Sequence, residues 1–346
     1  MLSLDGRDGG GHLVRTAVAL GGVTDTAFEM TNVRGARDRP GLRPQHVAAV
    51  QTVADVAGAV TEGVAQGSDR FRFDPGTVRG GRFDAAIGTA GSIPLVFDAV
   101  LPLATRLEEP ATVTVRGGTD VAWSPPIDYL RYVKLPTLSD VGVDATLAID
   151  RRGFYPRGGG SATLSLTPSS LGPVDRDDRG ALQSLAVYSV AASGLRSASV
   201  ADRQADAAAE ALADPVDAPI ETAVDYVDSL DDGSVLVLVA TYEETTAGFS
   251  ALGERGKPSE DVANAAVERF EAFRETEAAV DPNLADQLVP YLALAGGRVS
   301  IPTVTDHVRT AVDLVRAFGR EIKIDESGGD PPTLEAPIPD RQGTTP

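Results

Sequence analysis

The sequence of 346 residues contains no cysteine, only three histidines and one tryptophan, and no apolar run long enough to span a membrane. The absence of cysteine excludes disulfides, thiolate metal sites and cysteine nucleophiles. The start, Met1 to Arg7, has no basic segment followed by an apolar one, so no secretory signal is expected there. With a mean hydropathy of −0.06, these features predict a globular cytoplasmic protein that does not enter membranes.

Lysine is also scarce, although the chain is highly charged. The formal net charge is −19, and the three lysines are Lys134, Lys257 and Lys323. One interpretation is a halophilic type of acidic surface, because a Debye length of about 3 Å at 1 M salt removes most self-repulsion. The other is avoidance of polyanions. The arginines disfavour the second, because they concentrate at 34–43, 79–82 and 151–157, although such clusters are more often solvated surface than sites.

Apolar periodicity predicts alternating strands and helices in the first half of the chain. Strands are expected at 27–33, 71–73, 112–116, 145–149 and 162–167. Helices are expected at 13–20, 44–57, 93–103 and 128–141. Repeated β–α units without a dinucleotide-binding fingerprint indicate an α/β or α+β core of similar modules.

A charged, turn-rich stretch at 173–180 precedes a second block, which is compatible with a small inserted domain. Its strands are expected at 185–192, 220–227 and 234–241, and its helices at 201–213 and 259–276. Residues 325–346 are rich in Gly, Pro and Asp, and we expect them to form a loosely ordered tail.

His307 lies where an alternating apolar run gives way to a helical pattern. Thr305 is placed to cap this helix. The buried stripe is expected at Val308, Ala311, Val312 and Val315. The helix dipole there disfavours imidazolium and favours a phosphate, so a neutral imidazole is equipped to attack phosphorus. A capping or surface histidine without chemistry is the alternative, and this segment alone favours it.

Four glycine-rich turns stand out, at 5–12, 88–92, 117–120 and 152–160. The first runs directly into a helix, where backbone N–H groups can approach an anion, with Arg15 one turn further on and Asp8 available to a cation. It matches neither G-x-x-x-x-G-K-[ST] nor G-x-G-x-x-G. Each turn alone is ordinary, but four of them beside arginine clusters favour a phosphate-handling enzyme over a binding scaffold.

Six short motifs occur in a characteristic order. They are Gly9-Gly-Gly-x-x-x-Arg15, Arg39-Pro-Gly-Leu-Arg-Pro-Gln45-His46, Gly88-Thr-Ala-Gly-Ser92, Gly117-Gly-Thr-Asp120, Gly153-Phe-Tyr-Pro-Arg-Gly-Gly-Gly160 and Leu284-Ala-Asp286-Gln287. Together they resemble the RNA 3′-terminal phosphate cyclase family. The resemblance covers residues 2–325 and is weakest through 180–270.

The resemblance implies a core of three repeated βαβ-type modules with a small inserted α/β domain. The implied boundaries are 1–178 for the first part of the core, 179–271 for the inserted domain, 272–325 for the last part of the core, and 326–346 for a disordered tail. It also implies an ATP-dependent, ligase-type enzyme acting on RNA with a 3′-terminal phosphate. His307 is the implied nucleophile, forming a covalent His–AMP intermediate. AMP then passes to the RNA as RNA-(3′)pp(5′)A, and the 2′-OH closes a 2′,3′-cyclic phosphate, with Mg or Mn neutralising the triphosphate.

The resemblance assigns further roles by position. Asp8 is implied as a metal ligand. The implied phosphate-binding residues are Arg15, Arg37, Arg39, Gln45 and His46. The implied nucleotide-binding residues are Asp98, Pro125, Tyr129, Asn283, Leu284, Ala285, Asp286 and Gln287, with Pro125 and Tyr129 packing the adenine. A purely structural role for His46 inside its helix is an equal alternative.

Four positions depart from the family pattern. Asp8 is one carbon shorter than the usual glutamate, and His12 replaces the usual glutamine. Asp98 replaces a nucleotide-contacting glutamine, and an acid there is expected to repel ATP phosphates unless a metal intervenes. Asn283 replaces an aromatic residue that can stack on adenine. These changes bear on ATP affinity and base selectivity.

Two other interpretations compete with a cyclase. One is a cyclase-like, non-catalytic factor in ribosomal RNA processing, but such relatives lack the nucleophilic histidine, which is present here as His307. The other is the distantly similar enolpyruvyl transferase fold, which predicts lysine-rich phosphate sites that this chain lacks. The sequence assigns no particular RNA, metal preference or oligomeric state.

Overall fold

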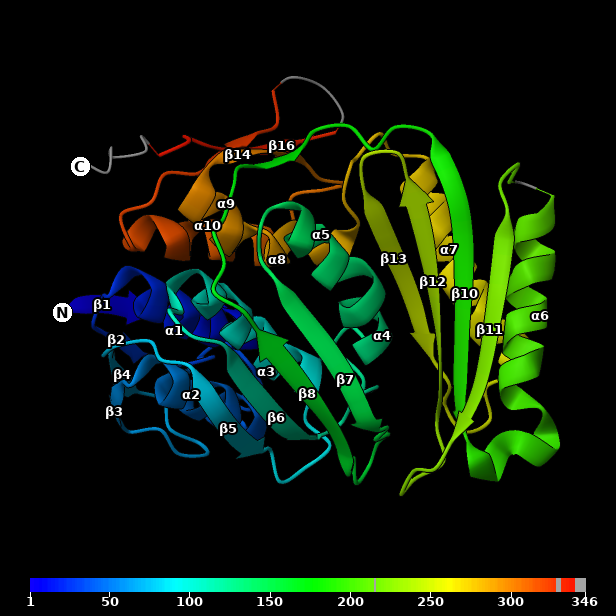
Figure 1. Ribbon diagram of the computed structural model, residues 1–346, viewed down its shortest axis with the longest axis horizontal. Helices are drawn as coiled ribbons and strands as arrows, with labels where there is room; N and C mark the ends of the chain where they lie inside the picture. Colours follow the sequence, from blue (N-terminus) through cyan, green and yellow to red (C-terminus); the bar gives the residue numbers. More distant parts are fainter. Residues whose placement is uncertain (215, 328–330, 340–346) are drawn as a thin grey trace.

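The computed structural model describes residues 1–214, 216–327 and 331–339, and its core contains three sheets of one topology (Figure 1). The first contains β1 (Leu2–Asp5), β2 (Phe28–Thr31), β3 (Val60–Glu62) and β4 (Phe71–Asp74), in the order β1-β2-β4-β3. The second contains β5 (Gly81–Ala86), β6 (Ala111–Gly117), β7 (Ala145–Arg151) and β8 (Gly160–Leu166), in the order β5-β6-β8-β7. The third contains β9 (Val174–Arg176), β14 (Gly297–Ser300), β15 (Lys323–Asp325) and β16 (Thr333–Ala336), in the order β9-β14-β16-β15.

In each sheet the first two strands pair in parallel and the remaining pairs are antiparallel. Parallel neighbours need a crossover, and a helix supplies it in every module. The crossover helices are α1 (Gly11–Thr24), α3 (Ile93–Val100) and, in the third module, α8 (Pro282–Gln287) with α9 (Val289–Ala295). The repetition confirms the predicted core of three βαβ-type modules.

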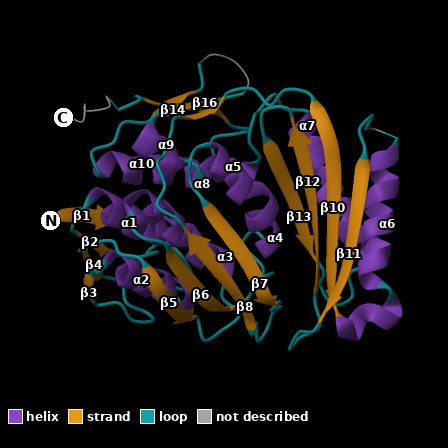
Figure 2. Cartoon of the chain, viewed as in Figure 1, coloured by secondary structure: helices purple, strands orange, loops and turns teal. Residues whose placement is uncertain are grey.

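A second set of helices follows the second strand of each module. They are α2 (Pro44–Ala57), α4 (Ile127–Tyr129) continuing through a π-turn into α5 (Leu135–Asp140), and α10 (Asp306–Ala317). Helices from different modules pack together, with α1 contacting both α3 and α10, and they gather between the sheets in Figure 2. Their apolar stripes form one hydrophobic core shared by all three modules.

An additional α/β unit lies in the chain between β9 and α8. It contains β10 (Leu182–Ala192), α6 (Val200–Ala213), β11 (Ile220–Val227), β12 (Ser234–Tyr242), β13 (Thr246–Leu252) and α7 (Ser259–Arg274). Its strand order, β11-β10-β12-β13, differs from that of the modules. Both helices cover one face of the sheet (Figure 1) and enclose a separate hydrophobic cluster. The inserted α/β unit is therefore as predicted, while the boundaries expected for it remain a prediction.

The expectation of a disordered tail over 326–346 is wrong for β16. This strand pairs with both β14 and β15 and completes the third sheet, with Leu334 only 1% exposed. The Gly-, Pro- and Asp-rich composition around it concealed a strand of four residues. Residues 328–330 and 340–346 of the expected tail lie outside the described residues. In the part of the chain that is described, no helix has the length and apolar character needed to cross a bilayer.

Candidate functional site

A cleft of about 1390 Å³ lies between the helices of the core and the inserted unit. The starts of α1, α2 and α10 and the length of α8 line it on one side, and β13 and α7 line it on the other. Among the described residues, six cationic side chains line the cleft: Arg15, Arg34, Arg37, Arg43, Lys257 and Arg269. Four acidic ones from the same part of the chain do so: Asp98, Glu254, Asp286 and Asp306. In a chain of net charge −19, this local excess of positive charge indicates an anionic ligand.

His307 is in the first turn of α10 and opens into this cleft. Thr305 caps the helix as predicted, its hydroxyl oxygen accepting a hydrogen bond from the Val308 N–H at 3.2 Å. The predicted stripe is confirmed as buried at Val308, Ala311, Val312 and Val315. The stripe fixes the helix, so the opposite side carries a His307 side chain that is 54% exposed.

The carboxylate of Asp286 faces His307, with Oδ2 3.6 Å from Nδ1 of the ring. This is ion-pair range rather than hydrogen-bond length. A carboxylate on that side favours the tautomer with a proton on Nδ1, which leaves the lone pair on Nε2. The arrangement therefore presents one defined nitrogen of a half-exposed imidazole to the cleft.

His12 packs directly against His307, with ring centroids 4.3 Å apart and planes inclined at 35°. Its Nε2 lies 2.8 Å from the Thr310 hydroxyl, which itself donates to the Asp306 carbonyl at 2.7 Å. Nε2–H of His12 is therefore the donor, and its Nδ1 is a buried acceptor without a hydrogen-bond partner among the described residues. Burial, aided by the nearby His307 and Arg15, lowers the pKa of His12 to about 3, so the ring is neutral at pH 7. Sequence reasoning noted His12 only as a departure and missed this contact.

Asp98 is flanked by two cations. Lys134 Nζ hydrogen-bonds its Oδ1, and Arg15 Nε lies 3.8 Å from its Oδ2. Burial lowers the pKa of Arg15 to about 10, which leaves it protonated at neutral pH. These contacts offset part of the charge of Asp98, and the expectation that Asp98 repels ATP phosphates unless a metal intervenes stays a prediction.

Four of the five predicted phosphate-binding residues line the cleft: Arg15, Arg37, Gln45 and His46. Arg39 is not among the lining residues. It is exposed, and its carbonyl accepts a hydrogen bond from Arg34 Nη1 at 2.8 Å. Arg34 and Arg43 line the cleft instead, and the arginine cluster at 34–43 was the signal that could have found them.

His46 has a structural role in the fold. Its Nδ1 accepts a hydrogen bond from the Arg43 N–H at 3.0 Å, forming part of the cap of α2. Burial and the nearby Arg15 lower its pKa to about 3, so it is neutral. Its Nε2 faces the start of α1 so closely that a Cβ on Gly11 would overlap it. A role for His46 in binding substrate stays a prediction.

The predicted nucleotide-binding residues fall into two groups. Five line the cleft: Asp98, Pro125, Asn283, Asp286 and Gln287. Three are buried beside it, with exposures of 1% for Tyr129, 0% for Leu284 and 1% for Ala285. The expectation that Tyr129 packs against a base is therefore not supported by its position, because a contact surface has to be accessible.

Tyr129 instead holds Asp281, a residue that sequence reasoning missed. Its hydroxyl donates to both carboxylate oxygens of Asp281 at 2.9 Å. Asp281 caps α8 by accepting from the N–H groups of Asn283 and Leu284, and it also accepts from Gly248 N–H of β13. Burial raises its pKa to about 6. The Asp-Pro start of the helix was the available signal.

Asp8 is exposed and is not among the residues that line the cleft. Over the described residues, no group of three or more His, Cys, Asp or Glu side chains could hold a metal ion. The assignment of Asp8 to a metal stays a prediction.

The family model of RNA 3′-terminal phosphate cyclase matches residues 7–324. The chain belongs to this family. A protein of Halobacterium salinarum named RNA 3′-terminal phosphate cyclase is 49% identical over 335 residues, covering 94% of this chain and 96% of the relative. Cyclases so named from Pyrococcus furiosus and Archaeoglobus fulgidus are each 38% identical, covering 92% and 94% of this chain and 93% and 98% of those relatives. The solved enolpyruvyl transferase NikO from Streptomyces tendae is 12% identical, covers 97% of this chain and 65% of its own, and has a TM-score of 0.23. That likeness is too weak to bear on this cyclase-family chain.

Proposed function

We propose that the protein is an ATP-dependent RNA 3′-terminal-phosphate cyclase in which His307 carries AMP. The observation that carries the proposal is the half-exposed His307 imidazole, with Asp286 on its Nδ1 side, in a cleft rich in arginine. The family membership and the names of the relatives support the overall activity, and the geometry supports the covalent step.

In the first step, Nε2 of His307 attacks the α-phosphorus of ATP. An N–P bond forms and the P–O bond to pyrophosphate breaks. Asp286 stabilises the positive charge that develops on the ring. The arginines of the cleft, above all Arg15 and Arg37, stabilise the negative charge that moves onto pyrophosphate.

Two transfers complete the reaction. An oxygen of the RNA 3′-phosphate attacks the phosphorus of the adenylate, the N–P bond breaks, and RNA-(3′)pp(5′)A forms with His307 regenerated. The vicinal 2′-OH then loses its proton and attacks the 3′-phosphorus, and AMP leaves. The product is a 2′,3′-cyclic phosphate, and AMP and pyrophosphate account for the remaining atoms of ATP.

Pro125, Asn283 and Gln287 line the cleft, which supports a role for them in contacting the nucleotide. Tyr129, Leu284 and Ala285 act from beneath, by holding α8 in position. Asn283 offers no aromatic face to a base, so any stacking has to come from another residue.

The described residues include no group of three or more His, Cys, Asp or Glu side chains that could hold a metal ion. Mg or Mn would reach the site on the triphosphate, whose oxygens are themselves the ligands such ions prefer. We propose that Asp8 is the residue of the protein that binds this metal ion. We further propose a cytoplasmic location and an acidic surface suited to high salt.

The alternative, a non-catalytic factor in ribosomal RNA processing, requires no nucleophile, and the oriented His307 disfavours it. Incubation with ATP labelled at the α-phosphate separates the two. We expect an acid-labile, alkali-stable protein adduct that is absent in His307→Ala, with the folding of the variant checked by its melting temperature. The absence of any adduct across a range of salts and divalent metals would favour the non-catalytic factor.

A further inference from the structure

The loop between β6 and α4 carries the one tryptophan of the chain, Trp123. The residue is 99% exposed, although an indole is among the most favourable groups to bury. Trp123, Ser124 and Pro125 all line the cleft that contains His307. Trp123 is therefore an exposed aromatic residue on the lining of the candidate site.

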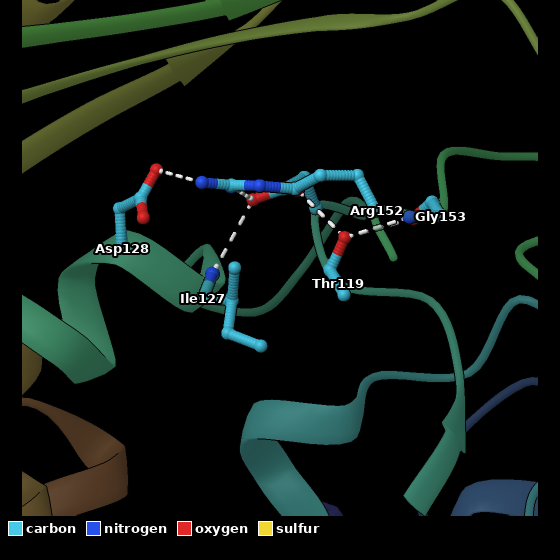
Figure 3. Close-up of polar contacts among 6 residues, drawn as sticks. Thr119, Ile127, Asp128, Arg152 and Gly153 are labelled. Atoms are coloured by element: carbon cyan, nitrogen blue, oxygen red, sulfur yellow. Dashed lines mark hydrogen bonds and ion pairs between the residues drawn. The ribbon is translucent and has the colours of Figure 1, made fainter. Parts of the chain in front are cut away.

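A buried ionic network fixes both ends of this loop (Figure 3). Arg152 Nη1 lies 3.2 and 3.1 Å from the two carboxylate oxygens of Asp120, at the start of the loop. Its Nη2 lies 2.6 Å from Oδ2 of Asp128, just after the loop. Ile127 N–H donates to Asp120 at 3.3 Å and so ties the start of α4 to the other end of the loop. Both ends of the loop are therefore held in place by the same buried network.

The interior of the loop is also constrained. The Ser124 hydroxyl donates to the Val121 carbonyl at 3.2 Å, and Pro125 and Pro126 restrict the backbone that follows. Trp123 itself has a φ of 62°, in the left-handed region that large side chains rarely adopt. A strained backbone that holds an aromatic ring out of the core at a candidate site indicates a functional constraint.

The chemistry around the ring narrows the ligand class. A flat π surface on the same cleft as cationic side chains fits a planar base joined to phosphate, because the ring can stack on the base while the arginines bind the phosphates. Asn283, on the same cleft, cannot supply such a surface. Stacking also resists salt, whereas arginine–phosphate contacts weaken as salt rises.

We propose that Trp123 is a nucleobase-stacking residue at the cleft, which rests on the proposed function in so far as the ligand is a nucleotide. The base belongs either to ATP or to the 3′-terminal nucleotide of the RNA. Both sources share the chemistry of a purine or pyrimidine face stacked on indole. The loop 121–126 and its buried anchor, Asp120–Arg152–Asp128, together present that face.

Intrinsic fluorescence tests the proposal directly, since Trp123 is the only tryptophan. The full chain is titrated separately with ATP, with a 3′-phosphorylated oligoribonucleotide, and with inorganic tripolyphosphate as the ligand without a base. We expect one of the first two to quench the emission and tripolyphosphate not to. Quenching by ATP identifies the adenine, and quenching by the oligonucleotide identifies the RNA base. Binding of either ligand, measured by equilibrium dialysis, without any quenching would overturn the proposal.

Variants supply a second measurement. Trp123→Ala should weaken the ligand that quenches by about 5- to 100-fold in Kd, the range that loss of one base–aromatic stack produces. Trp123→Phe keeps a stacking ring and should stay within about threefold of the parent. Tyr155→Ala is the matched control, because Tyr155 is 74% exposed but does not line the cleft. Equal Kd values for Trp123→Ala and Tyr155→Ala would overturn the proposal.

These readouts are independent of the covalent step. Quenching without any His307 adduct would leave Trp123 as a base-binding residue in a protein that is not a cyclase. An adduct without quenching, and with normal ATP and RNA affinity in Trp123→Ala, would remove the Trp123 proposal and leave the cyclase.

Discussion

Two buried charged clusters in this molecule differ in how completely their hydrogen bonds are made. In the Asp120–Arg152–Asp128 network, the guanidinium meets both carboxylates, and neither these side chains nor Thr119 contributes an unpartnered buried atom. In the cluster beside His307, formed by His12 and Arg15, Nδ1 of His12 and Nε of Arg15 are buried with no hydrogen-bond partner in the described part of the chain. In the first network the polar atoms are already hydrogen-bonded within the protein, so they are not available to a ligand. In the second cluster, polar atoms at the site can still form hydrogen bonds with a ligand. We infer that the first cluster serves the fold and the second serves the reaction.

The largest effect should come from breaking the Asp120–Arg152–Asp128 network. Arg152→Met leaves two carboxylates buried without their cation, which should lower the free energy of unfolding by about 3–5 kcal/mol. Urea unfolding at constant high salt measures this. The control is Arg203→Met, which breaks an exposed pair with Glu260 at 2.8 Å and should cost below about 1 kcal/mol. Similar losses in both variants would remove the distinction between a buried network and a surface pair.

The next effect tests the cluster beside His307. In Asp286→Asn, the amide can donate to Nδ1 and so favour the wrong tautomer, with the proton on Nε2. We expect adenylylation of His307 to slow by about 100-fold, or about 2.7 kcal/mol in activation free energy, while the melting temperature stays near that of the parent. Asp313→Asn, on the exposed face of the same helix, is the control for a lost surface charge. An adenylylation rate within threefold of the parent in Asp286→Asn would show that Asp286 does not orient the nucleophile.

The hydrogen bond that His46 Nδ1 accepts in the cap of α2 is also part of the fold, and the pH dependence of stability tests its contribution. Its pKa in the folded protein is lowered to about 3 from an ordinary value of 6.5, so the unfolded chain binds a proton first as the pH falls. Stability from this group is therefore present above pH 6.5 and is lost as the pH falls toward 3. His46→Gln keeps an acceptor for the Arg43 N–H without titrating. Relative to the parent, it should gain about 2 kcal/mol in unfolding free energy between pH 7 and pH 5. If the difference in unfolding free energy between His46→Gln and the parent were the same at pH 7 and pH 5, His46 would not be held neutral in the folded protein.

The helix start at His307 was predicted correctly because its signals are local. The Thr305 cap and the periodic stripe lie within one helix, and both are as predicted. The buried position of Tyr129 was missed because a motif mixes residues that touch a ligand with residues that support them. The Lys134–Asp98 pair joins residues 36 positions apart, and no periodicity reports such a tertiary contact. Strand β16 was missed for the same reason, because its partners in the sheet, and not its composition, make it a strand.

The smallest effect is expected from substitution of His12, where the unfolding free energy and the rate of adenylylation should respond differently. His12→Phe keeps a ring against His307 but removes both the unpartnered Nδ1 and the donor to Thr310. Removing a desolvated acceptor gains about 1 kcal/mol and losing the hydrogen bond to Thr310 costs about as much, so the unfolding free energy should stay within about 1 kcal/mol of the parent. Loss of the bond to Thr310, in the turn that carries His307, should slow adenylylation by about tenfold at saturating ATP. His12→Gln restores a donor and should recover the rate to within about threefold, through a hydrogen bond worth about 1 kcal/mol. A Phe variant that is both more stable and fully active would mean that the unpartnered atom is a packing defect, and the contrast between the two clusters would then carry no functional meaning.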